Sequence, residues 1–264
     1  AACGMKRPAE SIDAATVAPV LPPLAPAPCG AADLDESGPP PVPQPFRRVR
    51  VIRTAKNTGD LLAELKPLAL GADGSGGAQA SSVYVAPHSC SDKPFLGFGG
   101  SFTEASAVVL KRMSAERQDE IIRAYFDPVQ GIGYSIGRVP IASCDFSLGN
   151  WTCGDLREGD QSLSGFNLDR YRAAILPLLK AALAVRQAPI RLLASPWSPV
   201  PWMKTKKLFY GDGHLKPECA PAWALHFAKF IRGMEEYGIP IWAVSVQNEP
   251  EAAQSWESCI YTAE

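Results

Sequence analysis

One acidic side chain is distinguished by its position: Glu249 lies just after the apolar segment 241–247, between Asn248 and Pro250. A carboxyl group at the mouth of a half-apolar cavity has its charged form disfavoured, which suits a general acid. Cleavage of a glycosidic bond commonly uses two carboxyl groups, and a neighbouring Asn can hydrogen-bond the sugar 2-hydroxyl. The tripeptide alone is equally compatible with an ordinary turn after a strand.

Polar and aromatic side chains follow other predicted strands in the same way. The apolar segments 95–100, 133–140 and 190–195 alternate with amphipathic segments, which predicts a parallel sheet covered by helices. Each of these strands, and the segment 241–247 after them, ends in side chains that could act on a ligand: Ser101, Thr103 and Glu104; Arg138 and Asp145; Trp197; Asn248 and Glu249.

This distribution separates two architectures, a doubly wound sheet and a (β/α) barrel. In TIM barrels the working groups collect at the carboxyl ends of several strands. A doubly wound nucleotide binder would concentrate its signal in one glycine loop, and the segment 97–102 departs from G-x-G-x-x-G because its last position is Phe102. The prediction is therefore an α/β fold, the N-terminal part of a (β/α)8 TIM barrel.

The helices between these strands have recognisable ends. A helix is predicted from Glu104, restarting at the N-cap Ser114 and ending near residue 126. A second is predicted over 168–185, with Pro177 inside it expected to kink or split it. A third is predicted over 222–237, with Gly238 after its end. Two tryptophans of this region, Trp223 and Trp242, are expected in the core.

Three parts are predicted along the chain. Residues 1–46 are a disordered Pro/Ala-rich leader, since residues 1–45 hold 11 of the 25 prolines. Residues 47–94 form a short β element, with strands over 47–54 and 82–86. Residues 95–264 form the first half of the barrel. Eight βα units need about 250 residues, so we expect the sequence to be a truncated part of a longer protein.

Composition excludes several classes of protein. A formal net charge of −1 argues against a nucleic-acid partner. No apolar run is long enough for a transmembrane segment, although action on a lipid at a membrane surface needs none. Seven scattered cysteines and three distant histidines do not form a zinc pattern, and the disulfide state and the localisation stay open.

Four ordered segments resemble consecutive blocks of glycoside hydrolase family 30, in its glucosylceramidase-like branch: 97–104, 138–150, 193–198 and 242–250. The resemblance covers about residues 48–264. It implies a (β/α)8 barrel with an accessory β-sandwich, to which 47–94 would contribute, and hydrolysis with retention. It further implies catalytic glutamates on strands four and seven. By motif match Glu249 is the acid/base, and the nucleophile lies beyond Glu264, so we expect this segment alone to be inactive.

The resemblance also assigns substrate-binding roles. Asn248 matches the contact to the 2-hydroxyl, Asp145 a contact to hydroxyls of the non-reducing sugar, and Trp197 the apolar wall of that subsite. Arg138 matches an arginine beneath the catalytic carboxylates. Plainer roles are also open: a turn or N-cap for Asp145, rim packing for Trp197, and a structural ion pair for Arg138. Glu104, at a helix start, is interpreted as structural because it meets the helix dipole.

The leading functional hypothesis is a β-glucosidase that acts on glucosylceramide or a related β-glucoside. β-1,6-Glucanase or β-xylosidase activity is the alternative within the family. A non-catalytic sugar-binding protein is the alternative of another class, and a nucleotide-dependent enzyme is disfavoured by the broken glycine pattern. Contact with a membrane surface is compatible with the lipid substrate. The chemistry needs no metal and no organic cofactor. Three aromatic residues are candidates for contacts to the leaving group: Trp151, Trp202 and Tyr210.

Overall fold

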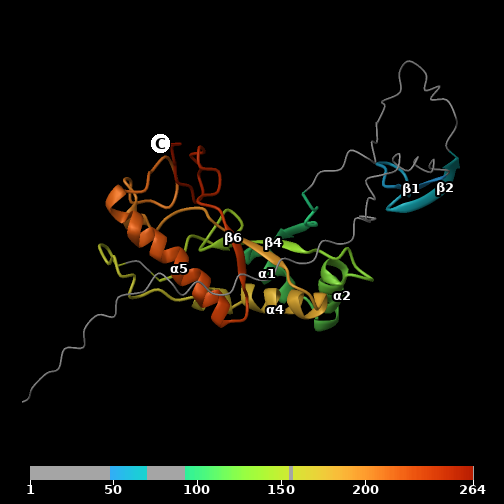
Figure 1. Cartoon of the computed structure of the whole chain (residues 1–264), viewed down its shortest axis with the longest axis horizontal. Coiled ribbons are helices and arrows are strands. Elements are labelled where there is room, and N and C mark those ends of the chain that lie inside the picture. The colour runs from blue at the N-terminus through green and yellow to red at the C-terminus, as the bar shows by residue number, and fades with distance from the viewer. Residues whose placement is uncertain (1–47, 70–92, 155–156, 264) are drawn as a thin grey trace, which may run out of the picture. The chain divides into compact units, whose positions relative to one another are not determined.

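The computed structural model describes residues 48–69, 93–154 and 157–263. Contacts divide the chain into two compact units, with the boundary between Pro94 and Phe95 (Figure 1). Within the described ranges, no helix is long and apolar enough to cross a membrane.

The first unit contains an antiparallel pair of strands, β1 (Arg48–Arg53) and β2 (Ala63–Ala69). The predicted strand over 47–54 is confirmed. The sequence did not predict β2, because Pro67 lies inside it and proline is unusual in a strand except at an edge. The predicted strand over 82–86 lies outside the described residues.

The second unit is built on a parallel sheet in which the strands follow one another in sequence order. The predicted alternation of strands and helices is confirmed, and it is the repeat of a βα barrel. The first strand is shorter and later than predicted because residues 95–98 remain outside the sheet, with Phe95 and Phe98 exposed. The strands are β3 (Gly99–Ser101), β4 (Ile136–Ile141), β5 (Arg191–Pro196) and β6 (Ile241–Val244).

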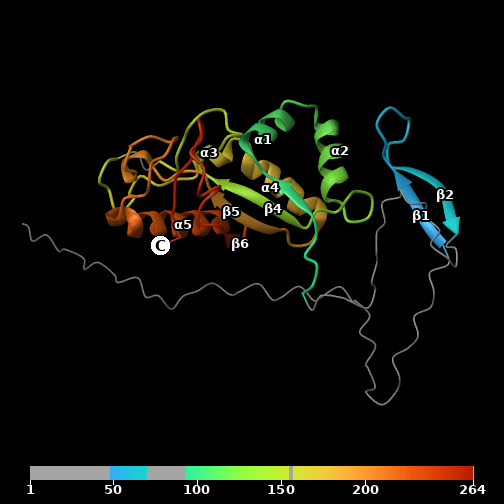
Figure 2. The ribbon, with the colours of Figure 1, turned by 90° about the horizontal axis from the view of Figure 1, so that it is seen from above.

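Helices connect these strands and flank the sheet (Figure 2). The predicted restart at Ser114 is confirmed, since its hydroxyl accepts a hydrogen bond from the backbone N–H of Arg117 at the start of a helix. The helices are α1 (Glu104–Lys111), α2 (Ala115–Phe126), α3 (Asp169–Arg172), α4 (Ile175–Arg186) and α5 (Ala220–Glu236), with 3-10 turns η1 (Pro201–Met203) and η2 (Pro217–Cys219).

The predicted helix over 168–185 is split, as Pro177 suggested, but the break precedes the proline. The chain leaves helical geometry between α3 and α4, and Pro177 occupies the first turn of α4. A residue in the first turn needs no backbone donor, so proline is tolerated there. Gly238, with φ of 78°, follows the end of α5 as predicted.

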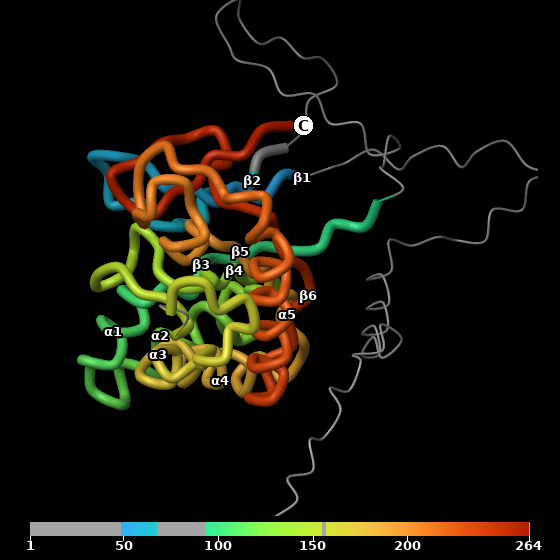
Figure 3. The backbone as a smooth tube through the Cα atoms, turned by 90° about the vertical axis from the view of Figure 1, so that its left-hand side faces the viewer, coloured from blue at the N-terminus to red at the C-terminus, as the bar shows by residue number. Residues whose placement is uncertain are grey.

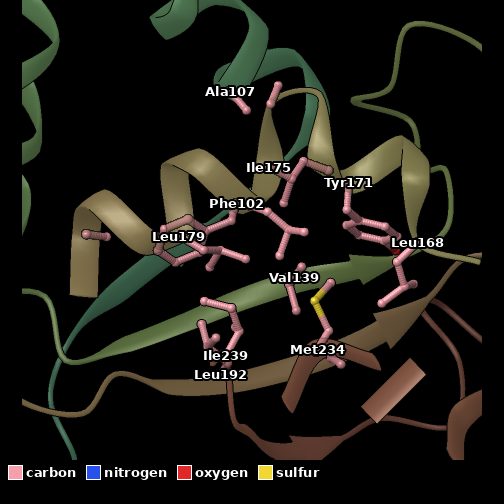
Figure 4. Close-up of a cluster of buried hydrophobic side chains, with 14 of the residues drawn as sticks. Phe102, Ala107, Val139, Leu168, Tyr171, Ile175, Leu179, Leu192, Met234 and Ile239 are labelled. Atoms are coloured by element: carbon pink, nitrogen blue, oxygen red, sulfur yellow. The ribbon is translucent and has the colours of Figure 1, made fainter. Parts of the chain in front are cut away.

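The two faces of the sheet differ in burial. Val139 and Ile141 of β4 and Leu192 of β5 have no solvent exposure, and they pack with Leu179 of α4 and residues of α5 (Figure 4). Because side chains alternate along a strand, Arg138 lies on the opposite face of β4. The helices therefore cover one face, and the other face carries the polar side chains of the site.

One of the two predicted core tryptophans is not buried. Trp223 is 4% exposed in a second apolar cluster beneath the loop after β5, whereas Trp242 on β6 is 47% exposed. Within the described part of the chain, β6 is paired only with β5, so it is an edge strand. Its outward side chains Trp242 and Val244 are consequently half open.

Candidate active site

Arg138 of β4 joins three segments of the sheet's polar face. Its Nη2 donates hydrogen bonds of 2.8 Å to the Ser195 hydroxyl on β5 and 2.7 Å to the Asn248 side-chain oxygen after β6. Ser195 is in turn hydrogen-bonded to the hydroxyl of Ser245. The guanidinium thereby fixes the orientation of the Asn248 side-chain amide.

The same guanidinium covers one face of Trp197. Its central carbon lies 4.4 Å from the ring centroid, and Trp197 is only 6% exposed. Burial lowers the pKa of Arg138, while the nearby Cys144, Asp145 and Glu249 side chains oppose that shift. Even a lowered pKa leaves an arginine charged at neutral pH, so the site keeps a fixed positive charge.

Glu249 occupies a strained backbone position in the loop after β6. Its φ of 45° lies in the left-handed region, which a glutamate adopts at an energetic cost. Flanking hydrogen bonds hold this geometry: Asn248 N donates to Pro196 O at 2.8 Å, and Tyr261 N donates to Pro250 O at 2.8 Å. The Glu249 side chain is exposed, and its Oε2 accepts a 3.2 Å hydrogen bond from the amide of Gln254.

Asp145 lies at the tip of a tight turn after β4. The turn is closed by Ser147 N donating to Cys144 O at 2.9 Å, which leaves the Asp145 side chain exposed. The start of this loop is anchored by Tyr171, whose hydroxyl donates to Pro140 O and accepts from Ala142 N, both at 2.7 Å. Ala142 has a φ of 65°, so this buried tyrosine holds a second strained position.

Glu104 organises the far side of the same loop. It is 6% exposed, and its carboxylate accepts from Leu148 N at 2.9 Å, from Trp151 Nε1 at 3.2 Å and from Arg170 Nε at 2.6 Å. Glu104 therefore has a structural role, as predicted, but that role extends beyond its position at the start of α1. Besides beginning a helix, Glu104 determines the path of the loop that carries Asp145.

Lys204, in the loop after β5, is fully buried and was not predicted as a site residue. Its amine donates to the Ser198 hydroxyl at 3.0 Å, to Phe209 O at 3.1 Å and to Ser258 O at 2.6 Å. Burial lowers its pKa to about 8, against the opposing effect of the nearby Cys259 and Glu257 side chains. No sequence pattern singles it out, because Lys204 precedes two further lysines in a loop whose composition is typical of a solvated segment.

Gln247 and Glu257 are two more contributors that the sequence analysis missed. Gln247 is buried and donates to Trp197 O at 2.6 Å and Asn248 O at 2.9 Å, which fixes both backbones. Glu257 is 4% exposed and accepts from the side chain of Asn150 at 2.7 Å, joining the loops after β4 and β6.

The five predicted site residues thus lie on β4 or in the segments that follow β4, β5 and β6. Arg138 contacts both Trp197 and Asn248, and Asp145 and Glu249 lie on flanking loops within electrostatic range of Arg138. Of the candidate aromatic contacts, Trp202 is 7% exposed in the second apolar cluster, whereas Tyr210 is 45% exposed. Among the described residues, no group of three His, Cys, Asp or Glu side chains is placed to hold a metal ion.

Successive βα units with polar side chains gathered after the strands define this part of the chain as a portion of a TIM-barrel enzyme domain. Residues 95–264 match the Glycosyl hydrolase family 30 TIM-barrel domain, and the chain belongs to this family.

Individual relatives agree with this assignment. The chain is 40% identical over 161 residues to the lysosomal acid glucosylceramidase of Mus musculus, covering 59% of this chain and 31% of that protein. The crystal structure of SrfJ from Salmonella typhimurium aligns with a TM-score of 0.60 at 40% identity, covering 63% of this chain and 37% of that one. An endo-β1,6-glucanase structure aligns with a TM-score of 0.57 at 31% identity, covering 62% and 37% respectively. The chain thus spans about a third of the length of these proteins.

Proposed function

We propose that the complete protein is a retaining β-glycosidase that hydrolyses the β-glucosidic bond of glucosylceramide or a related β-glucoside, with Glu249 as general acid/base. The observation that carries the proposal is the strained turn of Glu249 beside the Arg138–Asn248 pair. A carboxyl group held at an unfavourable φ, next to an amide and a cation on the open face of a βα sheet, is typical of a catalytic position.

The proposed first step transfers a proton from Glu249 to the glycosidic oxygen while the C1–O bond breaks. The electrons of that bond go to the leaving oxygen, so the aglycone departs as a neutral alcohol. Asn248 would hydrogen-bond the 2-hydroxyl, and Asp145 would bind other hydroxyls of the same sugar. Arg138 would keep Asn248 oriented through its 2.7 Å hydrogen bond. The second carboxylate, which forms the glycosyl-enzyme, would come from another part of the protein.

The test uses the complete protein with phenyl β-glucoside, whose poor leaving group needs a proton. Glu249→Gln should lower kcat/KM by roughly 10²- to 10⁴-fold, and NMR of the wild-type reaction should detect the β-anomer first. An unaffected Glu249→Gln variant, or an α-anomer formed first, would contradict the proposal. Sugar binding without turnover in the wild type would select the non-catalytic alternative.

A β-1,6-glucanase is the second candidate, supported by the 31% identity to the solved endo-β1,6-glucanase. The similarity to the mouse glucosylceramidase, at 40% identity, favours the first. Parallel assays with glucosylceramide in detergent micelles and with a β-1,6-linked glucan distinguish them. Faster release of glucose from the lipid supports glucosylceramidase activity.

We also propose that residues 47–94, with β1 and β2, contribute to an accessory β-sandwich, and that 1–46 is a leader. Support comes from exposed apolar side chains such as Ile52, which is 51% exposed, since a two-stranded unit alone is marginally stable. Limited proteolysis of the complete protein should cut within 1–46 first. Early cleavage within β1 or β2 would contradict this division.

A further inference from the structure

The loop after β6 folds back so that one of its side chains reaches Glu249. Gln254 lies five residues further along, and its Nε2 donates a 3.2 Å hydrogen bond to Oε2 of Glu249. The amide is the only side-chain donor that the described residues present to this carboxylate as a direct hydrogen bond. Because an amide donor holds a carboxyl group in a defined orientation, Gln254 restricts where the second oxygen, Oε1, can point.

The backbone of Gln254 is held from two sides. Gly211 N donates to Gln254 O at 2.9 Å, and Gln254 N donates to the Ser258 hydroxyl at 3.2 Å. That hydroxyl donates to Gly211 O at 2.9 Å, and the buried amine of Lys204 donates to Ser258 O. Figure 3 shows the loops after β5 and β6, in orange and red, side by side. Gln254 is therefore a fixed support rather than a side chain on a free loop.

The backbone of Glu249 is equally constrained. Its left-handed φ and the hydrogen bonds of its neighbours Asn248 and Pro250 leave only the side-chain torsions free. An exposed glutamate would otherwise sample several rotamers. A general acid needs its proton within hydrogen-bond reach of the atom that receives it, so the remaining freedom matters for the reaction.

We propose that Gln254 is a positioning residue for Glu249: its amide occupies Oε2, so that the proton to be transferred is carried on Oε1, facing the leaving group. The inference rests on the proposed function and deepens it. In the proton-transfer step Oε1–H breaks and a new O–H bond forms on the leaving oxygen as the C1–O bond breaks. The resulting carboxylate keeps its hydrogen bond from Gln254 throughout, because an amide N–H suits an ionised acceptor.

The charged groups around this pair come from more than one element. Arg138 on β4 interacts electrostatically with Glu249 and with Asp145 in the loop after β4. Within the loop itself, Glu251 is exposed and Glu257 is buried against Asn150. A change at Gln254 leaves all four of these groups in place, so its effect can be separated from theirs.

The experiment compares two substrates of the complete protein. Phenyl β-glucoside has a poor leaving group that needs a proton, whereas 2,4-dinitrophenyl β-glucoside departs without one. Gln254→Leu should lower kcat/KM for the phenyl glucoside about 10- to 100-fold, with a change below about threefold for the dinitrophenyl glucoside. Gln130→Leu, exposed near the amino end of β4, is the matched control and should alter neither value.

Gln254→Glu, which introduces a side chain of nearly the same shape, provides an independent readout. Two carboxyl groups at that separation cannot both ionise readily, so they hold a proton to higher pH. The alkaline limb of the kcat/KM profile for phenyl glucoside should therefore move upward relative to wild type. Such a shift would show that side chain 254 lies against the Glu249 carboxyl group in the working enzyme, as the positioning role requires.

The outcomes separate the two proposals. The positioning role alone is overturned if the wild-type enzyme cleaves both substrates, Gln254→Leu loses equally on both or on neither, and the pH limb of Gln254→Glu does not move. A wild-type protein that cleaves neither substrate overturns the proposed function and this inference with it. A selective loss on the phenyl glucoside, or an upward shift of the limb, supports the positioning role even where the other variant folds poorly.

Discussion

The amine of Lys204 donates a 2.6 Å hydrogen bond to the carbonyl oxygen of Ser258, 54 residues further along the chain. This contact joins the loop after β5 to the loop after β6. Two further acceptors, the Ser198 hydroxyl and Phe209 O, complete the three hydrogen bonds that an ammonium group can donate. A buried cation with every donor used fixes the loops that flank Glu249, so the geometry of the site depends on a residue that does not face the site.

We expect Lys204→Met to destabilise the protein. Methionine fills similar space but leaves the Ser258 and Phe209 carbonyls without this donor, at a cost of about 2–4 kcal/mol in the free energy of unfolding. Chemical denaturation measures the loss. Lys206→Met is the control, since Lys206 is exposed and its ion pair with Asp212 is exposed as well, and it should leave the denaturation midpoint nearly unchanged. Equal losses in the two variants would contradict the anchoring role of Lys204.

Arg138→Lys should impair catalysis more than folding. Lysine keeps the charge but lacks the planar fork that reaches Ser195 and Asn248 while lying on Trp197. With Asn248 free to rotate, kcat/KM of the complete protein for an aryl β-glucoside should fall about 100-fold. Arg172→Lys, an exposed change on α3, serves as the control. A variant with wild-type kcat/KM would show that the guanidinium does not orient the site.

Arg138 and Lys204 differ in whether the sequence could predict their roles. Arg138, Asn248 and Glu249 could be predicted because each stands in or just after an apolar strand, and parallel strands bring such positions to one end of the sheet. The positions of α1 and α2 followed from local signals, namely the cap at Ser114 and the spacing of apolar residues. Both kinds of signal lie within a few neighbouring residues.

The supporting contacts could not be predicted in that way. Glu104 and Arg170 are 66 residues apart, and no local pattern pairs them. Lys204 stands among other lysines, so only the fold distinguishes the buried amine from its solvated neighbours. The prediction that Trp242 is buried was wrong for a different reason. An apolar residue on a strand is buried only when another element packs over it, and β6 is an edge strand in the described structure.

Glu104→Gln should loosen the loop that carries Asp145. The carboxylate accepts from Leu148 N, Trp151 Nε1 and Arg170 Nε, and an amide would offer one oxygen and direct its own donors at the remaining partners. We expect a loss of about 2 kcal/mol in the free energy of unfolding and a raised KM for the β-glucoside. Glu120→Gln, which breaks only the exposed pair with Arg117, should change neither quantity. Thermal denaturation and steady-state kinetics report the two effects, and an unchanged KM would separate Glu104 from the substrate site.

The last prediction concerns acid stability and the buried imidazole of His226. Burial lowers the pKa of His226 to about 3, with a smaller contribution from the charge of Lys229. Its ring packs between Phe166 and Trp223, with centroid distances of 5.1 Å and 4.7 Å. Above its unfolded pKa of about 6.5, the imidazole is neutral in both states, so it imposes no pH dependence there.

Below that pH His226 is protonated in the unfolded chain, whereas in the folded protein it stays neutral down to about pH 3. The unfolded state then binds more protons, so His226 should reduce the free energy of unfolding by about 1.4 kcal/mol for each pH unit of acidification between about pH 6 and 4. His226→Phe keeps an aromatic ring in the cluster and should remove this component of the slope. His214→Phe, exposed in the loop after β5, is the matched control and should retain the wild-type slope. Denaturation curves at several pH values measure it, and a His226→Phe slope equal to wild type would mean that the imidazole is protonated inside the folded protein.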